Sequence, residues 1–378
     1  MLDESLLDDP EALARADRRG LLRGAAEAGA RVRTAARHAA EAGIAALNPE
    51  GRPRAVLVAG SGSAATGVAD LIGALAGASA PVTRLTPTGV APAAGALRWN
   101  LPGWAGSLDL LLVVTTDGSE PGLAVLTEQA YRRGCQVVAV TPKGSPLAEA
   151  VDAAHGLVVP LATAPHELYE ATLAASPGAL WALFTPLLAL LDRVGLLEAP
   201  PETLAKVADR LDRTAERCGP AIATYSNPAK TLAAELADSL PLIWTEGEGA
   251  APVGRRFAAV LAELSGRPAL AAELPEALPA HGILLAGALA AGADADDFFR
   301  DRVEDPQALR ARIVLLRDRP IGGLTAAPAA RELALGHDTA ISELEPEEGT
   351  LLESIAELIA VTDFAAVYLA LATPATPS

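Results

Sequence analysis

Short apolar runs recur along the first half of the chain, and most of them lead through a turn into a helical pattern. These runs are residues 55–59, 110–115, 136–140 and 157–159. Runs of this length that are apolar on both faces are typical of strands inside a parallel sheet, and the helical patterns between them suit crossover connections. The pattern therefore predicts an α/β fold, a doubly wound parallel sheet with helices on both faces.

The second half repeats this alternation less regularly. We expect helices at 201–217, 253–264 and 347–372, and strands at 240–244, 269–272, 283–285 and 313–316. The dipeptide Pro200-Pro201 follows a long apolar helix and marks a domain boundary. The predicted organisation is an N-terminal helical segment (1–29), a first domain (30–197), a second domain (198–372) and a tail (373–378).

The charge balance excludes several classes of partner. The chain has 30 lysines and arginines against 47 aspartates and glutamates, a formal charge of −17, which disfavours nucleic acids and anionic membranes. The longest apolar stretch, 179–191, is interrupted by Pro186 and is too short to span a bilayer, and the charged N-terminus does not resemble a secretory signal. Two distant cysteines favour a reducing cytoplasm and indicate neither a disulfide nor a metal site. We expect no metal and no cofactor.

Two glycine-containing turns follow predicted strands, Gly60 to Ser63 and Thr116 to Ser119. Ligands of open parallel sheets bind outside the carboxyl ends of the strands. The backbone N–H groups of Gly62, Ser63 and Ala64 would form an anion site at a helix N-terminus. The first turn lacks both the full dinucleotide fingerprint and the GK[ST] of a P-loop, which disfavours a nucleotide-binding oxidoreductase. Alone, such a turn is equally compatible with a purely structural role.

Six short stretches carry a resemblance to one protein family. Gly62-Ser63-Ala64 resembles that family's GGSAIGGD loop, and residues 111–118 (LLVVTTDG) stand where it has a SYSGNT phosphate loop. The other four are AYRRGCQVVAVTPKG at 130–144, NPAK at 227–230, IVLLRD at 313–318 and DFAAVYLAL at 363–371. In this order, over nearly the whole chain, they resemble the bifunctional phosphoglucose/phosphomannose isomerases of the SIS (sugar isomerase) fold.

The resemblance implies two flavodoxin-like SIS domains that interconvert glucose 6-phosphate or mannose 6-phosphate with fructose 6-phosphate, without a metal. In that chemistry a carboxylate base moves a proton between C1 and C2 through a cis-enediol, and an imidazole assists ring opening. By its place in the family's segments, Glu263 takes the position of the base and His281 that of the imidazole. The phosphate is assigned to Gly62, Ser63, Ala64, Thr115, Gly118 and Ser119. The ligand is thus a sugar phosphate, and the resemblance also implies a homodimer.

Both catalytic candidates have a structural alternative. Glu263 lies in an alanine- and leucine-rich helical segment, where an acidic residue is commonly just solvated. His281 follows Pro279-Ala280 in an expected loop before a strand, where a lone histidine is usually a surface or capping group. Lys230 of the NPAK stretch is expected to fix a helix start rather than to contact substrate.

The sequence also departs from the family pattern where the chemistry is most demanding. TTDGSE replaces SYSGNT and places Asp117 and Glu120 where hydroxyls would hold a phosphate. Like charges ~4 Å apart repel by roughly 4 kcal/mol at an effective dielectric constant of about 20. Gly178 stands in place of the family's arginine, and residues 373–378 lack the family's C-terminal lysine.

Two functions therefore stay open. One is a phosphosugar isomerase with a partly degraded site, and the other is a noncatalytic SIS protein that binds a phosphosugar or a regulatory partner. The lost cations lead us to expect weak or absent isomerisation. We also expect Glu263 and His281 to face one cleft shared with Ser63 and the 115–119 loop.

Overall fold

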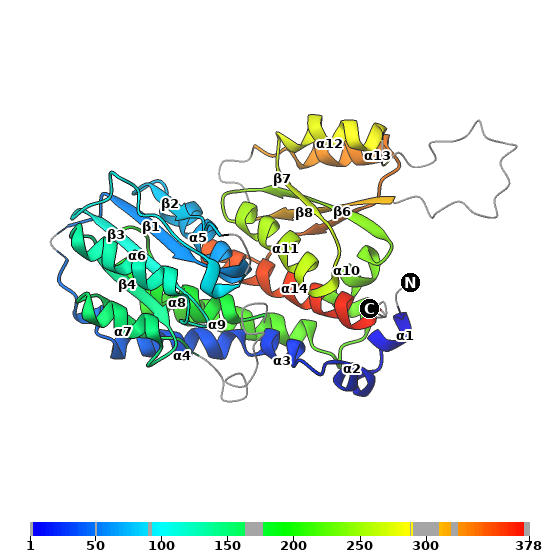
Figure 1. Cartoon of the computed structure of the whole chain (residues 1–378). Coiled ribbons are helices and arrows are strands. Elements are labelled where there is room, and N and C mark those ends of the chain that lie inside the picture. Colours follow the sequence, from blue (N-terminus) through cyan, green and yellow to red (C-terminus); the bar gives the residue numbers. More distant parts are fainter. Residues whose placement is uncertain are drawn as a thin grey trace, which may run out of the picture. The chain divides into compact units, whose positions relative to one another are not determined.

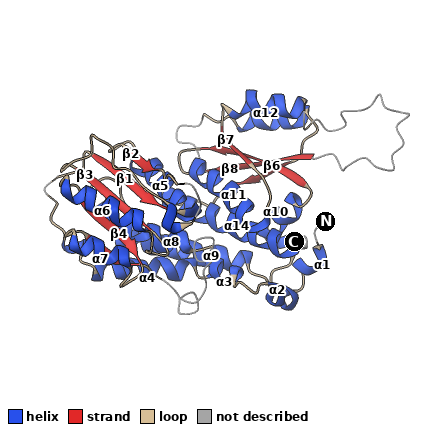
Figure 2. Cartoon of the chain, viewed as in Figure 1, coloured by secondary structure: helices blue, strands red, loops and turns tan. Residues whose placement is uncertain are grey.

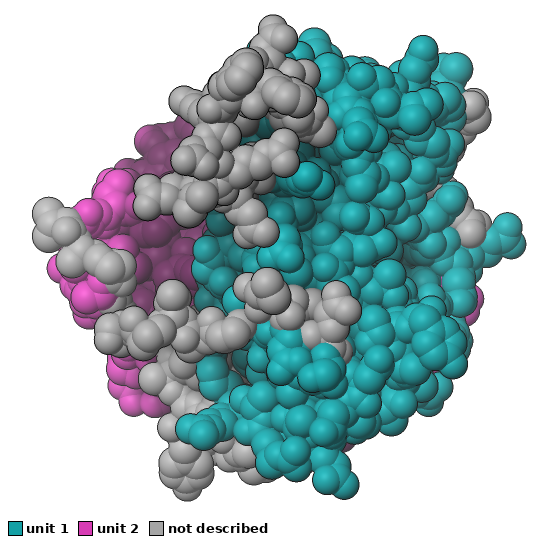
Figure 3. Space-filling view, turned by 90° about the vertical axis from the view of Figure 1, so that its right-hand side faces the viewer, with its two compact units in different colours: residues 1–22, 213–378 teal, residues 23–212 magenta. Residues whose placement is uncertain are grey.

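The computed structural model describes residues 3–49, 51–89, 93–162, 177–287, 289, 310–318 and 324–373. By its internal contacts the chain divides into two compact units (Figure 3), an N-terminal unit of residues 23–212 and a C-terminal unit of residues 1–22 with 213–378. The sequence placed domain limits at 29/30 and 197/198. The division by internal contacts falls within helices α3 (Leu21–Ala26) and α9 (Pro201–Cys218), and the predicted domain limits stay a prediction.

The N-terminal unit is built on a five-stranded parallel sheet in the order β2-β1-β3-β4-β5 (Figure 1). Its strands are β1 (Ala55–Gly60), β2 (Val82–Leu85), β3 (Asp109–Val114), β4 (Gln136–Thr141) and β5 (Leu157–Pro160). This order is that of a flavodoxin-like sheet, in which the direction of the crossovers reverses between β1 and β3. The predicted doubly wound fold is confirmed for this unit.

Helices cover both faces of this sheet (Figure 2). They are α4 (Ala28–Glu41), η1 (Ile44–Ala46), α5 (Gly62–Ala76), η2 (Ala94–Ala96), α6 (Pro121–Arg132), α7 (Pro146–Ala153) and α8 (Ala179–Arg193). Leu123 and Leu126 of α6 and Leu147 of α7 pack in one core with Leu57 and Leu111 of the sheet. On the other face α5 packs against β1 and α8, and α8 packs against α4.

The C-terminal unit has a four-stranded parallel sheet in the order β7-β6-β8-β9. Its strands are β6 (Ser239–Glu246), β7 (Leu270–Glu273), β8 (Arg310–Arg317) and β9 (Ile341–Leu344). Its helices are α1 (Glu4–Leu7), α2 (Pro10–Ala16), η5 (Thr224–Ser226), α10 (Pro228–Leu236), α11 (Ala250–Ser265), α12 (Ala277–Ala286), α13 (Ala327–Gly336) and α14 (Leu351–Ala372). Helices α10 and α11 pack against α14, and α12 and α13 cover the opposite face of the sheet.

Helix α14 forms the core of the C-terminal unit. Within the described residues it is the one helix long and apolar enough to cross a membrane, but 89% of its apolar window is buried inside the fold. Such extensive burial is typical of the core helix of a folded domain. Asp363 of α14 forms a buried bidentate ion pair with Arg256 of α11, and Tyr368 donates a hydrogen bond to the Cys218 carbonyl at 2.6 Å. A cytoplasmic location stays a prediction.

Three short elements differ from the sequence-based expectation. The expected strand at 283–285 is wrong, because these residues belong to helix α12, which buries Ala277, His281 and Leu285 at a helical spacing of four. A short apolar run does not distinguish a strand from a buried helix. Strands β2 and β9 were not predicted, because both lie at a sheet edge and contain charged residues.

The NPAK stretch has a structural role. Asn227 caps α10 by accepting hydrogen bonds from the N–H groups of Ala229 and Lys230, both at 3.1 Å. Lys230 is fully buried, and its Nζ donates to the carbonyls of Pro220 at 2.8 Å and Ile222 at 2.7 Å. The lysine therefore fixes the chain between α9 and α10, which confirms that it secures a helix start.

Replacing Lys230 with methionine should destabilise the protein strongly. The variant leaves two partly buried carbonyls without their donor, at about 1–3 kcal/mol each. We expect a loss of roughly 2–5 kcal/mol in the free energy of unfolding, measured by urea denaturation. Lys206→Met, at an exposed position of α9, is the control and should change stability by less than ~0.5 kcal/mol. Equal stability of the two variants would contradict the assignment.

Candidate functional site

The candidate site lies at the carboxyl edge of the N-terminal sheet, where β1 and β3 end side by side. Gly60 pairs with Val114 in the register of these strands, so the turn at 61–63 and the loop at 115–120 leave the sheet next to each other. This is the point where the crossover direction reverses, which is the usual ligand position in such sheets. The structure thus brings together the two turns that the sequence singled out.

A buried carboxylate occupies the space between these turns. Glu120 is 3% exposed and accepts hydrogen bonds from Ser61 Oγ at 2.9 Å and from Thr115 Oγ1 at 2.7 Å. Thr115 Oγ1 in turn accepts from the N–H groups of Asp117 and Gly118, both at 3.1 Å. The hydroxyls of Ser61 and Thr115 and the N–H groups of Asp117 and Gly118 are therefore already engaged within the chain.

The two acidic residues of the loop do not behave alike. Asp117 is exposed and accepts a short hydrogen bond from Ser119 Oγ, whereas Glu120 points inward. Gly118 has φ +74°, and a Cβ there would lie 2.6 Å from Thr141 Oγ1, so only glycine lets the loop pack onto the β4–α7 turn. Of these two acidic residues, only Glu120 is buried against the hydroxyls of Ser61 and Thr115.

The start of α5 presents the second part of the predicted anion site. Gly62, Ser63 and Ala64 form its first turn, and Ser61 precedes it as the N-cap residue. The Ser61 hydroxyl is directed to Glu120 and makes no capping bond to the helix. The α5 terminus and the Glu120 carboxylate are thus connected through Ser61.

At the carboxyl edge of the C-terminal sheet, two carboxylates accept hydrogen bonds from backbone N–H groups at the starts of helices. Asp318, which follows β8, accepts from the N–H groups of Gly249 and of Ala250 (3.1 Å) at the start of α11. Glu246, the last residue of β6, accepts from Arg317 Nε at 3.0 Å and from the Ala326 N–H before α13. Asp318, at the end of β8, therefore caps α11, the helix that follows β6. Glu246, at the end of β6, caps α13, the helix that follows β8.

The net pKa shifts of these two carboxylates have opposite signs. Burial raises the pKa of Asp318 above its ordinary value, although the N–H groups of Gly249 and Ala250 favour the charged form. For Glu246 burial acts in the same direction, but the hydrogen bonds from Ala326, Thr325 and Arg317 outweigh it and lower its pKa. Sequence reasoning did not single out either residue as a cap, because each lies far in sequence from the helix that it caps.

Glu263 lies at the other edge of the C-terminal sheet. It is exposed near the end of α11, which begins at the carboxyl end of β6 and returns to the start of β7. Arg267, just beyond α11, donates to the carbonyl of Leu236, shortly before β6 begins (3.4 Å). Glu263 is therefore on the amino-edge side, away from Asp318.

His281 does not lie in the loop that the sequence predicted, and that expectation is wrong. It is in helix α12, 7% exposed, and its Nδ1 accepts a hydrogen bond from Trp244 Nε1 at 2.7 Å. Trp244 belongs to the core beneath α12, whereas its neighbours Ile243 and Thr245 face Gly254 of α11. Within this unit Glu263 and His281 thus lie on opposite faces of the sheet. Their approach to the Ser63 and 115–119 loops stays a prediction.

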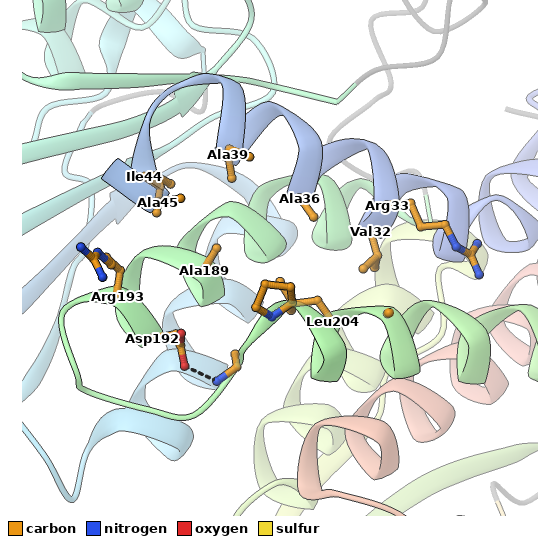
Figure 4. Close-up of a pocket in the computed structure, with 14 residues that line it drawn as sticks. Val32, Arg33, Ala36, Ala39, Ile44, Ala45, Ala189, Asp192, Arg193 and Leu204 are labelled. Carbon is orange, nitrogen blue, oxygen red and sulfur yellow. Dashed lines mark hydrogen bonds between the residues drawn. The ribbon is translucent and has the colours of Figure 1, made fainter. Parts of the chain in front are cut away.

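The N-terminal unit also contains a cavity of about 470 Å³ between α4, α8 and α9 (Figure 4). Its lining is mainly alanine, with Val32, Ile44 and Leu204. On its rim, Arg33 forms ion pairs with Asp209 and Asp212, and Arg193 donates to the Leu47 carbonyl. It lies beside the C-terminal end of α8, toward the start of β1, and it has no part in the Glu120 site.

Solved structures of other proteins share the fold of this chain. The chain resembles solved structures over almost its whole length: a proposed phosphosugar isomerase from Silicibacter pomeroyi (18% identity, TM-score 0.59, 92% of this chain and 95% of that one) and a glucose-6-phosphate isomerase like protein from Thermus thermophilus (18%, 0.52, 97% and 92%). Glucosamine-6-phosphate deaminase from Thermotoga maritima is similar at 11% identity and TM-score 0.54, over 91% of this chain and 92% of that one. At these identities the likeness concerns the fold.

A family model matches the C-terminal part of the chain. Residues 225–378 match the bacterial phospho-glucose isomerase C-terminal SIS domain. No curated protein sequence matches the chain. The predicted resemblance to SIS phosphosugar isomerases is therefore confirmed, by a domain match in the C-terminal part and by the fold over the rest of the chain.

The burial of His281 predicts a pH dependence of stability. Burial lowers its pKa below the ordinary value of 6.5, so the folded protein holds the imidazole neutral. Its contribution to stability is complete above pH ~6.5 and is lost as the pH falls through the folded-state pKa, because the unfolded chain then binds the proton more tightly. His281→Gln keeps an acceptor for Trp244 but does not titrate. The midpoint of urea unfolding should fall less between pH 7 and pH 5 for this variant than for the wild type. Equal falls would show that His281 titrates freely in the folded state.

Proposed function

We propose that this protein is a noncatalytic SIS protein that recognises a hexose phosphate, of the glucose, mannose or fructose 6-phosphate class, and isomerises it weakly or not at all. The domain match and the fold support recognition of a hexose phosphate, and the position of Glu120 is the observation that carries its weak isomerisation. The Glu120 carboxylate accepts hydrogen bonds from the hydroxyl of Thr115, which the family resemblance assigns to the phosphate, and from the hydroxyl of Ser61, which precedes the assigned Gly62. The chain itself thus supplies the anion that a substrate phosphate would otherwise supply.

The catalytic candidates support the same proposal. His281 is held in the core by Trp244 and lies across the sheet from the helix that carries Glu263. A base and an imidazole that act on one sugar must both come within hydrogen-bond reach of it. A single C-terminal unit does not provide that arrangement.

The second candidate function is isomerisation of glucose 6-phosphate or mannose 6-phosphate to fructose 6-phosphate, with Glu263 as the base through a cis-enediol. The match of residues 225–378 to a phospho-glucose isomerase domain favours it. A homodimer would favour the isomerase function, because a partner subunit can complete a site that one chain leaves open.

Steady-state assays separate the two functions. We expect turnover of glucose 6-phosphate and mannose 6-phosphate far below about 10 s⁻¹, the middle of the usual enzyme range. Formation of fructose 6-phosphate is measured by a coupled assay, with Glu263→Gln as the control for contaminating isomerase. Wild-type turnover near 10 s⁻¹ that disappears in Glu263→Gln would establish the isomerase instead.

Replacing Glu120 should restore phosphate affinity. Glu120→Thr removes the buried charge and leaves the hydroxyls of Ser61 and Thr115 free to bind a phosphate, so we expect fructose 6-phosphate to bind at least tenfold more tightly. Asp117→Ser removes an equal charge from an exposed position, so it should have a much smaller effect. Isothermal titration calorimetry measures both variants. Binding that is unchanged in Glu120→Thr would contradict the proposed role of Glu120.

We also propose that the protein is a homodimer, since alanine-rich helices with few charges make suitable apolar interfaces. Light scattering at micromolar concentration should give twice the mass of the chain. A monomeric mass would reject this part of the proposal.

A further inference from the structure

The cavity between α4, α8 and α9 opens between two helices that diverge. At its narrow end α4 and α9 are in backbone contact, because a Cβ on Gly29 would lie 2.6 Å from the carbonyl oxygen of Ala208. Farther along, Ala40 of α4 and Pro201 of α9 line opposite walls of the cavity, and Ala189 of α8 forms its floor (Figure 4). The cavity is therefore a wedge that widens toward the C-terminal end of α4.

The cavity is elongated and apolar along its middle. Its volume of about 470 Å³ is within the range of small-molecule sites, about 300–1,000 Å³. Its α4 wall extends from Val32 to Ala40, which is ~12 Å at ~1.5 Å per residue, and Ile44 and Ala45 continue it. The side chains between its two ends are mainly alanine and offer no hydrogen-bonding group. This middle part suits an unbranched apolar chain and does not suit a sugar.

The charged side chains of the lining lie at the two ends of the cavity, and the two ends differ. Arg33, at the narrow end, forms ion pairs with Asp209 and Asp212, both at 2.7 Å, so its charge is neutralised. Arg193 is at the opposite end (Figure 4), and its Nε donates to the carbonyl of Leu47 at 2.7 Å. Within the described residues, no carboxylate pairs with the Nη groups of Arg193. These donors are free to bind an anion.

The Arg193 end has a local excess of positive charge. The Arg52 guanidinium lies there too, because its Nε is 3.3 Å from the position of a Cβ on Gly195. Asp192 is the acidic residue of the lining, and its Oδ1 accepts a hydrogen bond from the Ala199 N–H at 2.8 Å. Two arginines thus stand against one aspartate, in a chain whose formal charge is −17. A planar guanidinium with free Nη groups matches a carboxylate in charge and in geometry.

We propose that this cavity binds a free medium-chain carboxylate, with its carboxylate on Arg193 and its chain between Ala189 and Leu204. An unbranched fatty acid of about ten carbons has the length for a cavity that follows ~12–18 Å of helix. The site is separate from the Glu120 site, since it lies at the opposite end of α8. The proposal therefore does not depend on recognition of a hexose phosphate.

The test begins with the length of the chain and the charge of its head. Hexanoate, octanoate, decanoate and the uncharged octanol are titrated into the full-length protein by calorimetry. Affinity should rise about fourfold for each added methylene, because each one leaves water for the apolar walls. Octanoate should bind roughly tenfold more tightly than octanol, because a hydrogen bond to a charged group is made only by the carboxylate. Affinity that does not depend on chain length would overturn the proposal.

Arg193→Gln separates binding of the head from a structural role of the arginine. We expect it to weaken octanoate roughly tenfold and to leave octanol unchanged, because only the charged head loses its partner. Arg37→Gln is the matched control, since Arg37 is exposed on α4, lies outside the lining and is close to Glu41. Equal losses for octanoate and octanol in Arg193→Gln would show that Arg193 supports the fold and does not bind the carboxylate.

Ala189→Leu fills the floor of the cavity. It should weaken both ligands at least tenfold without lowering the melting temperature, because the added side chain occupies space that the ligand would take. Ala329→Leu, at an exposed position of α13, is the control and should change neither. If Ala189→Leu does not fold, Ala40→Leu replaces it with the same criteria. Unchanged binding in the folded variant would overturn the proposal. So would loss of a dimer in light scattering without octanoate binding to the wild type, which would identify the cavity as a contact between copies.

Discussion

The carboxyl edges of the two sheets concentrate positive partial charge, and this constraint governs the rest of the structure. Every helix that follows a parallel strand begins at this edge with N–H groups that lack partners inside the helix. In the C-terminal unit the chain meets this demand with its own carboxylates, because Asp318 and Glu246 cap helices there. In the N-terminal unit Glu120 instead accepts from the hydroxyls of Ser61 and Thr115. A phosphate at the β1–β3 turns must therefore compete with Glu120 for these two hydroxyls.

The motifs shared with the sugar isomerases carry structure more clearly than catalysis. Asn227 and Lys230 fix the entry to α10, and Asp363 of the DFAAVYLAL stretch pairs with Arg256 across α11 and α14. Burial raises the pKa of Asp363, although the Arg256 guanidinium favours its charged form. Removing one partner of such a pair leaves an uncompensated buried charge, which is strongly destabilising. Retention of these motifs is therefore explained by folding alone, and the function has to be argued from the site.

A noncatalytic SIS protein is consistent with this division of roles. The fold and its packing residues are intact, whereas the hydroxyl of Thr115, one of the predicted phosphate donors, binds Glu120 and the candidate imidazole binds Trp244. Substitution at a ligand site leaves the core unaffected, because the site residues lie on loops beyond the strand ends. A chain can thus keep the architecture of an isomerase while its ligand preference and chemistry change.

The sequence by itself determined the class of fold, the positions of most strands along the chain and the departure of the phosphate loop from its family pattern. These features are local: an apolar run reports burial on both faces of a strand, and a loop motif is read residue by residue. Only the tertiary structure decided that Glu120 points inward while Asp117 points outward, that His281 is a core residue, and that alanines of α4, α8 and α9 enclose a cavity. Each of these facts depends on contacts between residues far apart in sequence or on the direction of a side chain. Neither is encoded in the spacing of hydrophobic and polar positions, because that spacing fixes which face of an element is buried but not what it is buried against.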